Sequence, residues 1–279
     1  MKIVNAVTTL AVACFAVYGC NEANPERKKE ARATESRIKE VNVEITRSGS
    51  YVIKCWSDEM GITGGFEVFK DGKRIFSGEP IPHRVEKIDG HGARDINGDA
   101  IPDVVVESYS GGAHCCFTTF VFALGDEFQK VAEFDGENTP VGFKDCDGDG
   151  IYEVTLADWT FQYWKTSFAD SPAEEVILRY KGGDYVVAKD LMRKEPPSQV
   201  EFEENVRDVR KGFFRREVPS SLWTHMLDLI YTGNGDLAWK FFNECWPAGR
   251  TGKERFLKEF KEQLGRSRYS SEIRSLNGW

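Results

Sequence analysis

The chain has little of what several classes of function require. It carries 37 Lys and Arg against 45 Asp and Glu, which gives a formal charge of −8, so it lacks the basic face that a nucleic-acid partner needs. It has four histidines, and no CxxC or HxxxH spacing indicates zinc binding or thiol catalysis. Apolar residues still make up 41% and aromatic residues 13% of the chain, which favours packed cores over disorder.

The apolar run at the start of the chain, residues 3–17, is too short for a membrane-spanning helix and has the layout of a secretory signal. Gly19 directly before Cys20 resembles the lipobox of bacterial lipoproteins. The resemblance implies a lipoprotein signal peptide over residues 1–19 and a lipid on Cys20. Because position 21 is not Asp, the family's sorting rule for two-membrane bacteria implies the outer membrane if the source has two membranes. An ordinary signal cleaved elsewhere is the alternative.

Residues 20–40 are charged and nearly free of large apolar side chains, which predicts a tether spanning roughly 25 Å as a flexible coil. Export implies an oxidising compartment. Five cysteines remain beyond the signal and the anchor, and this odd number leaves at least one thiol free or paired outside the chain. Cys115 and Cys116 either bridge to Cys55 and Cys146, or close a vicinal disulfide with each other, or stay reduced; Cys245 is the fifth.

Residues 41–192 show short β-branched or aromatic runs cut by Gly, Asp and Pro, a pattern that predicts an all-β domain. Three similar units of about fifty residues are recognisable, each with a strand, a loop and a strand–turn–strand. This length suits a four-stranded antiparallel unit such as a propeller blade, but three units are too few to close a ring. Either an open array of blades or, slightly favoured, two packed sheets would result.

Two acidic loops dominate this β domain. Oxygen-bearing residues alternate in both, and such alternation curls the chain so that successive odd residues face one centre, as a calcium site of six to eight oxygens requires. Four carboxylates against three favour tighter binding by the second loop, and Ala100 at a position suited to glycine should strain the first by about 1 kcal/mol. The expected ligands are Asp95, Asn97, Asp99, the carbonyl of Ile101 and Asp103, and then Asp145, Asp147, Asp149, the carbonyl of Ile151 and Glu153.

These loops are not EF-hands, because Val106 and Leu156 stand where an EF-hand needs a bidentate Glu. The segment Asp95 to Glu107, reading DINGDAIPDVVVE, resembles the calcium loops of FG-GAP and VCBS repeats, found in integrin-like propellers and bacterial surface proteins; Asp145 to Leu156 matches less well. The resemblance implies two structural calcium ions that hold neighbouring strands and do no chemistry. It does not extend into the C-terminal third.

Residues 196–279 predict a small helical bundle, so the fold class expected is segregated α+β. Pro196-Pro197 ends the β pattern, and Ser198 with Glu201 forms a capping box. Apolar residues then recur at helical spacing through three further segments, the last with Thr251 and Glu254 as a second capping box. Nothing in this part has the residues of a catalytic site.

These features together predict a lipid-anchored, exported, calcium-stabilised module that binds or assembles with a protein or ligand at the cell envelope. The alternative is a calcium-dependent hydrolase of phosphate esters or other anionic substrates. The turn between the first acidic loop and the cysteine pair has no structural explanation in the sequence. It is the candidate binding turn, with Ser110, Gly111, Gly112 and His114 as its residues.

Overall fold

The computed structural model describes residues 40–112 and 116–279. The predicted signal peptide, the Cys20 anchor and the tether up to residue 39 lie outside the described residues, as do His114 and Cys115. Residues 40–279 form one compact unit. In the described ranges no helix has the length and apolar character to cross a membrane.

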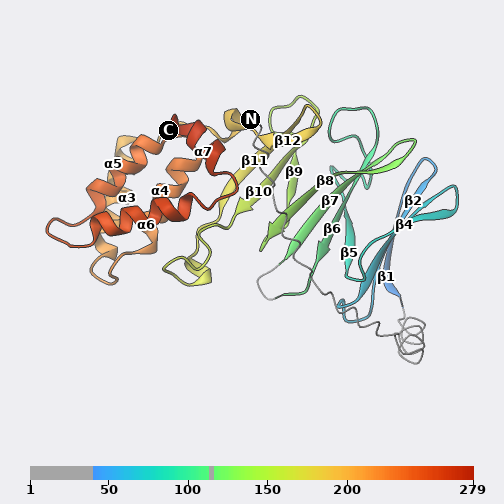
Figure 1. Cartoon of the computed structure of the whole chain (residues 1–279), viewed down its shortest axis with the longest axis horizontal. Coiled ribbons are helices and arrows are strands. Elements are labelled where there is room, and N and C mark those ends of the chain that lie inside the picture. The colour runs from blue at the N-terminus through green and yellow to red at the C-terminus, as the bar shows by residue number, and fades with distance from the viewer. Residues whose placement is uncertain (1–39, 113–115) are drawn as a thin grey trace, which may run out of the picture. The chain divides into compact units, whose positions relative to one another are not determined.

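The β half consists of three four-stranded antiparallel sheets, each made of four strands that are consecutive in the chain (Figure 1). The first contains β1 (Val41–Ser48), β2 (Tyr51–Ser57), β3 (Gly64–Lys70) and β4 (Lys73–Ser77). The second contains β5 (His83–Glu86), β6 (Asp103–Tyr109), β7 (Phe117–Leu124) and β8 (Phe128–Glu137). The third contains β9 (Gly142–Lys144), β10 (Glu153–Asp158), β11 (Glu174–Lys181) and β12 (Asp184–Val187).

The three repeated units of the sequence are therefore confirmed as separate sheets, and the alternative of two packed sheets is wrong. Each unit pairs only its own consecutive strands, since every connection within it returns to the neighbouring strand. A tight turn at Asp71-Gly72 joins β3 to β4, with positive φ at both residues, 50° and 76°. An Asp-Gly pair is a strong sequence signal for this conformation, which a two-residue hairpin needs.

The second sheet separates two hydrophobic cores. Val104 and Val106 of β6 pack in a cluster with residues of the first sheet, whereas Val105 between them belongs to a cluster with residues of the third sheet. This alternation follows from the two-residue period of a strand, which sends successive side chains to opposite faces. A continuous valine run is thus what a sheet covered on both faces requires.

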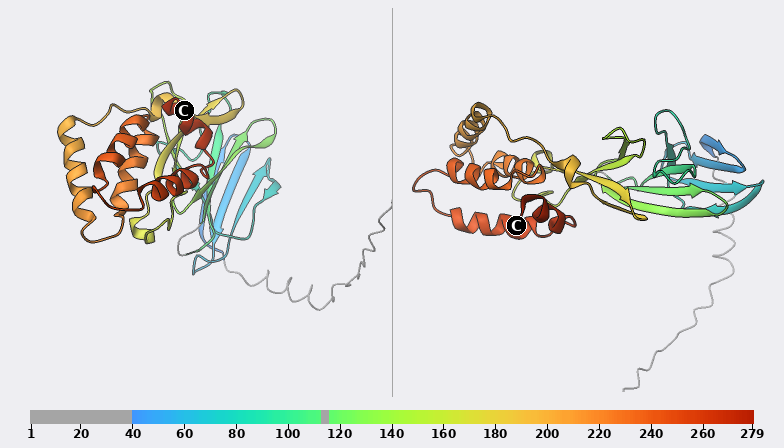
Figure 2. Two further views of the ribbon diagram at one scale, coloured as in Figure 1. Left: turned by 60° about the vertical axis from the view of Figure 1, so that its left-hand side comes forward. Right: turned by 90° about the horizontal axis from the view of Figure 1, so that it is seen from above.

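The helical half follows the third sheet and shares its core. In the views of Figure 2 the helices lie beside that sheet, and the larger buried cluster runs from β10 and β11 into the helices. Ser198 caps α3 by accepting a hydrogen bond from the amide of Glu201, as predicted. A short 3-10 turn, η1 (Phe168–Asp170), lies between β10 and β11. The helices that follow β12 are α2 (Lys189–Met192), α3 (Gln199–Gly212), α4 (Ser220–Tyr231), α5 (Gly235–Cys245), α6 (Lys253–Leu264) and α7 (Ser270–Asn277).

A buried carboxylate joins the third sheet to the helices. Asp158 at the end of β10 is 5% exposed. Its Oδ2 accepts a hydrogen bond from the hydroxyl of Tyr231 on α4 at 2.7 Å and another from the hydroxyl of Ser267, which lies between α6 and α7. Because each hydroxyl would lose a buried partner if the elements separated, these bonds fix the helices against the sheet.

A second carboxylate lies next to this seam. Glu174 at the start of β11 is paired across the sheet with Asp158. Burial raises the pKa of the Glu174 carboxyl to about 8, and the negative charges of Asp228 and Asp158 raise it further, while Lys194 opposes the rise. The carboxyl of Glu174 therefore favours its protonated form near neutral pH in the folded chain.

We expect Glu174→Gln to flatten the pH dependence of stability. The folded-state pKa lies above the ordinary value, so the contribution of Glu174 is fully present below about pH 4.5 and is lost as the pH rises through about 8. Glutamine mimics the protonated form and removes this loss. Urea unfolding at about pH 5 and pH 8 measures it. Glu175→Gln, at the exposed neighbouring position, is the control, and equal slopes in the two variants would contradict the assignment.

Candidate metal centre

The first acidic loop, residues 95–103, folds around its own side-chain oxygens. Asp95 accepts hydrogen bonds from the backbone amides three and five positions further on, at 2.7 and 2.8 Å. Asp103 accepts one from the amide of Ile96 at 3.1 Å, which closes the loop from end to end. Between them, Asn97 accepts from the amide of Asp99 at 3.0 Å and Asp99 from the amide of Ile101 at 2.8 Å.

The second acidic loop, residues 145–153, repeats this frame position by position. Asp145 accepts from the amides three and five positions further on, at 2.7 and 3.1 Å, and Glu153 accepts from the amide of Cys146 at 2.9 Å. The same bonds at the same spacing show that the acidic residues themselves set the loop conformation. Asp147 and Asp149 each accept from the amide two positions further on, at 3.3 and 2.8 Å.

In the second loop the side chains converge as a metal site requires. One carboxylate oxygen from each of Asp145, Asp147 and Asp149 lies within 4.8 Å of the other two. Oxygens bound at about 2.3–2.6 Å to one calcium ion lie at most about 5 Å apart, so the spacing fits one such ion. Ile101 and Ile151 occupy the seventh position of their loops, the place of the expected carbonyl ligand.

In the first loop one carboxylate oxygen lacks a partner. Asp103 is 2% exposed, and its Oδ1 makes no hydrogen bond within the described residues. Burial raises the pKa of this carboxyl to about 7, and the nearby charges of Asp99 and Asp95 raise it further. A buried carboxylate without a counter-charge destabilises the fold, so a cation bound at this loop would offset that cost.

In the second loop, an arginine side chain of the protein already neutralises part of the negative charge. Arg179 on β11 donates to Asp147 at 2.7 Å and to Glu153 at 3.2 Å, and Glu153 is fully buried. With Arg179 counted, four carboxylates and one guanidinium leave a net charge of −3, the same as the three carboxylates of the first loop. The electrostatic reason for expecting tighter binding by the second loop therefore disappears.

The two loops touch each other. The amide of Tyr152 donates to the carbonyl of Ile96 at 2.8 Å, and a Cβ placed on Gly98 would come within 2.9 Å of the side chain of Ile151. Gly98 has φ of 80°, so glycine is required there for both backbone conformation and space. The paired loops form a joint between the second and third sheets.

The candidate binding turn is described in part. The hydroxyl of Ser110 accepts from the amide of Cys116 at 2.9 Å, and Gly111 has φ of 82°. The carbonyl of Gly112 accepts from the hydroxyl of Tyr109. His114 lies outside the described residues. The described residues of the turn are thus held by bonds to the residues that flank it, Tyr109 and Cys116.

The disulfide expectation needs correction. Cys55 and Cys146 are free thiols, so the bridges expected from them to the cysteine pair are wrong. Cys55 is 1% exposed in the core between the first two sheets, where burial raises the pKa of its thiol to about 12. Cys116 is disulfide-bonded, and because Cys245 is also free, its partner lies outside the described residues. The vicinal ring stays a prediction.

A cleft of about 700 Å³ lies beside the turn, with Ser110 and Cys116 in its lining. Four aromatic rings contribute its apolar surface, and His83 adds a polar edge. Burial lowers the pKa of His83, whose Nδ1 lies 2.7 Å from the carbonyl oxygen of Ile81. No sequence pattern indicates a ligand-sized space here, because its lining comes from strands and turns far apart in the chain. The rings are those of Phe66, Phe76, Phe120 and Phe122.

Comparison with models of protein families, with curated proteins and with solved structures finds no match to this chain. The likeness to FG-GAP and VCBS repeats therefore depends on the loop residues themselves.

We expect Ala100→Gly to stabilise the fold and Gly150→Ala, at the matching position of the second loop, to destabilise it. Both positions have positive φ, 66° and 89°, which costs a residue with a Cβ about 0.5–1 kcal/mol relative to glycine. Urea unfolding of the two variants measures the opposite shifts. Shifts of the same sign would contradict the assignment of strain to Ala100.

We expect Arg179→Met to lower the free energy of unfolding by about 1–3 kcal/mol in chelator, because Glu153 would keep a buried charge without its partner. Added calcium should reduce this loss of free energy of unfolding, because the ion supplies the positive charge that the guanidinium supplied. Arg74→Met, which removes a surface pair with Glu67, is the control with an expected loss of about 0–1 kcal/mol. A loss that is equal with calcium and with chelator would contradict this role.

Proposed function

We propose that this protein is an exported, lipid-anchored binding module whose β half is stabilised by two structural calcium ions. The observation that carries the proposal is the hydrogen-bonded frame shared by the two acidic loops, with converging carboxylates in one and a buried, unpartnered carboxylate oxygen in the other. Hard, flexible oxygen cages of this kind favour calcium over magnesium, which demands a stricter octahedral geometry.

The ions would act at the joint between sheets. Each loop leads directly into a central strand, β6 or β10, and the loops contact each other through Tyr152 and Ile96. In this proposal the three sheets are blade-like units arranged as an open array, and the metal holds the second against the third. Calcium thus has a structural role rather than a catalytic one.

The binding partner would use the cleft beside the turn. The cleft combines aromatic rings with a few polar groups, which is the usual character of a ligand site. The partner we propose is a protein or ligand of the cell envelope, since the N-terminal sequence favours export and a lipid on Cys20, with the outer membrane as destination. Loss of radiolabelled lipid from the chain on Cys20→Ala would test the anchor.

The calcium proposal predicts a higher Tm in millimolar calcium than in chelator. At a hundredfold excess over Kd, each ion adds about 2.7 kcal/mol, which is several degrees for a chain of this size. Asp99→Asn and Asp149→Asn should each remove part of the shift, because asparagine keeps the side-chain oxygen that accepts the loop amide but loses the charge. Differential scanning calorimetry measures all three proteins.

Asp126→Asn, at an exposed turn outside both loops, is the matched control and should keep the full calcium shift. A Tm that is the same with calcium and with chelator would show that the loops are not metal sites. Hydrolysis of phosphate esters that Asp149→Asn abolishes without changing Tm would instead favour the calcium-dependent hydrolase.

A further inference from the structure

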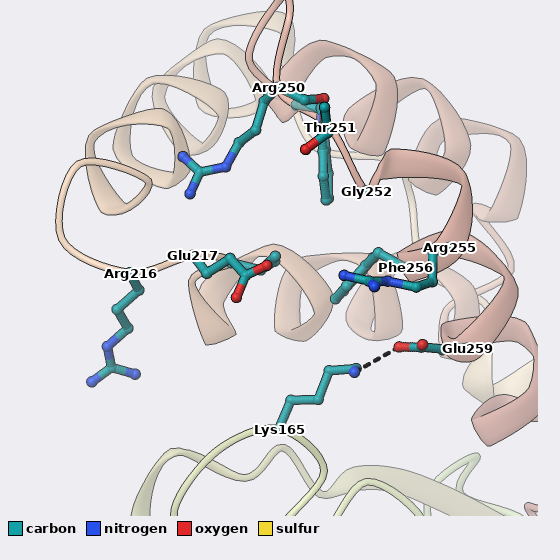
Figure 3. A pocket seen from close by; sticks show the side chains of 11 residues that line it. Lys165, Arg216, Glu217, Arg250, Thr251, Gly252, Arg255, Phe256 and Glu259 are labelled. Carbon is teal, nitrogen blue, oxygen red and sulfur yellow. Dashed lines mark hydrogen bonds and ion pairs between the residues drawn. The ribbon is translucent and has the colours of Figure 1, made fainter.

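A pocket of about 480 Å³ opens between the helices (Figure 3), and none of its lining residues belongs to the acidic loops. Its lining comes from three places: the loop before η1, the connection between α3 and α4, and the segment from the end of α5 into α6. We call it the basic pocket. Its charged lining residues are Lys165, Arg216, Arg250 and Arg255, with Glu217 and Glu259.

The positive charges of the basic pocket are only partly neutralised. Lys165 is paired with Glu259 at 2.6 Å, and Arg216 with an aspartate outside the pocket, Asp170, at 3.3 Å. Within the described residues, Arg250 donates to the backbone carbonyl of Phe213 and lies over the ring of the same residue. For Arg255, the described residues include no hydrogen-bond or ion-pair partner. Among the described residues, neither guanidinium has a carboxylate within ion-pair distance, although the charge of Arg255 helps to lower the pKa of Glu259. The net charge of the whole chain is −8.

The backbone adds to this positive character. Gly252 is the N-cap of α6, has φ of 87° and offers no side-chain cap. The capping box predicted at Thr251 is therefore wrong, because the helix begins after the glycine rather than after the threonine. Amides of the first helical turn have no partner within their helix, and they carry partial positive charge at the edge of the same pocket.

The remaining wall combines two aromatic rings with the side chains of Val218 and Thr251. Trp246 and Phe256 line the pocket beside the arginines, and their rings lie 5.7 Å apart. The space is larger than a single inorganic anion needs, so a ligand that fills it combines an anionic group with an apolar body. A phosphate monoester carries about −1.5 to −2 charge at neutral pH, which matches the two unpaired guanidinium groups.

We propose that the basic pocket binds a phosphate monoester with an aromatic or other apolar body. The phosphate lies against Arg250 and Arg255, and the body lies on Trp246 and Phe256. Glu217 extends into the same space as the two arginines (Figure 3) and makes no ion pair within the described residues. Its carboxylate opposes an anion, so it limits the affinity. This site does not depend on calcium.

Titration calorimetry with phenyl phosphate tests the proposal on the full chain in chelator. Arg255→Gln should weaken binding about tenfold or more, as loss of one charge-assisted contact does. Glu217→Gln should tighten binding, because it removes the opposing charge. Inorganic phosphate, which lacks the ring, and phenol, which lacks the charge, should both bind more weakly than phenyl phosphate.

Lys258→Gln is the matched control, since it removes the same charge from an exposed position of α6 outside the pocket. Phenyl phosphate affinity that is unchanged in Arg255→Gln, or equally weakened in Lys258→Gln, would overturn the proposal. Calorimetric unfolding of the same variants excludes loss of fold as the cause, because Arg255 makes no bond within the described residues.

Vesicles containing phosphatidic acid, whose head group is the same monoester, identify the source of the phosphate. Vesicle binding that Arg255→Gln removes would assign the pocket to a lipid. Binding of phenyl phosphate but not of vesicles, with the same sensitivity to Arg255→Gln, would assign it to a soluble phosphate. Either result supports recognition of a phosphate monoester by this pocket.

Discussion

The hydrogen bonds between aspartate side chains and their own loop amides are the constraint on which the β half depends. Asp95 and Asp145 each bind two amides within five positions, so a nine-residue segment is closed without help from the rest of the chain. Each closed segment delivers the next strand, β6 or β10, to the centre of its sheet. The two loops also hydrogen-bond to each other, so they position the second sheet relative to the third.

The negative charges of four carboxylates in this fold are compensated in different ways. These differences distinguish carboxylates with a purely structural role from a candidate metal ligand. Glu153 has a guanidinium partner, and Asp158 has hydroxyl donors from two helical segments. Burial favours a proton on Glu174. Among the described residues, Asp103 has the only fully buried carboxylate oxygen without a hydrogen-bond partner. This imbalance supports a metal ion at the first loop more directly than the acidity of either loop, since acidic turns are common on protein surfaces.

Much of the β half could be predicted because its signals are local. The turn at Asp71-Gly72, the paired spacing of acids and the valine run of β6 each depend on residues close in sequence. The first strand of each sheet was missed: β5 and β9 have only four and three residues, which carry no periodicity, and β1 was not recognised as part of the first unit. Arg179 was missed for another reason: it meets Glu153 only once β10 and β11 are paired in register.

By itself, the sequence determined the three strand units, the two acidic loops and the capped start of α3, because hydrogen bonds within a few residues specify them. Tertiary structure decided which charges meet. It placed an arginine in the second loop, left one carboxylate oxygen of Asp103 without a partner in the first, and kept Cys55 as a free, buried thiol. It also gathered lysine and arginine residues from three separate segments around one pocket. Such contacts join residues tens of positions apart, and no local pattern encodes them.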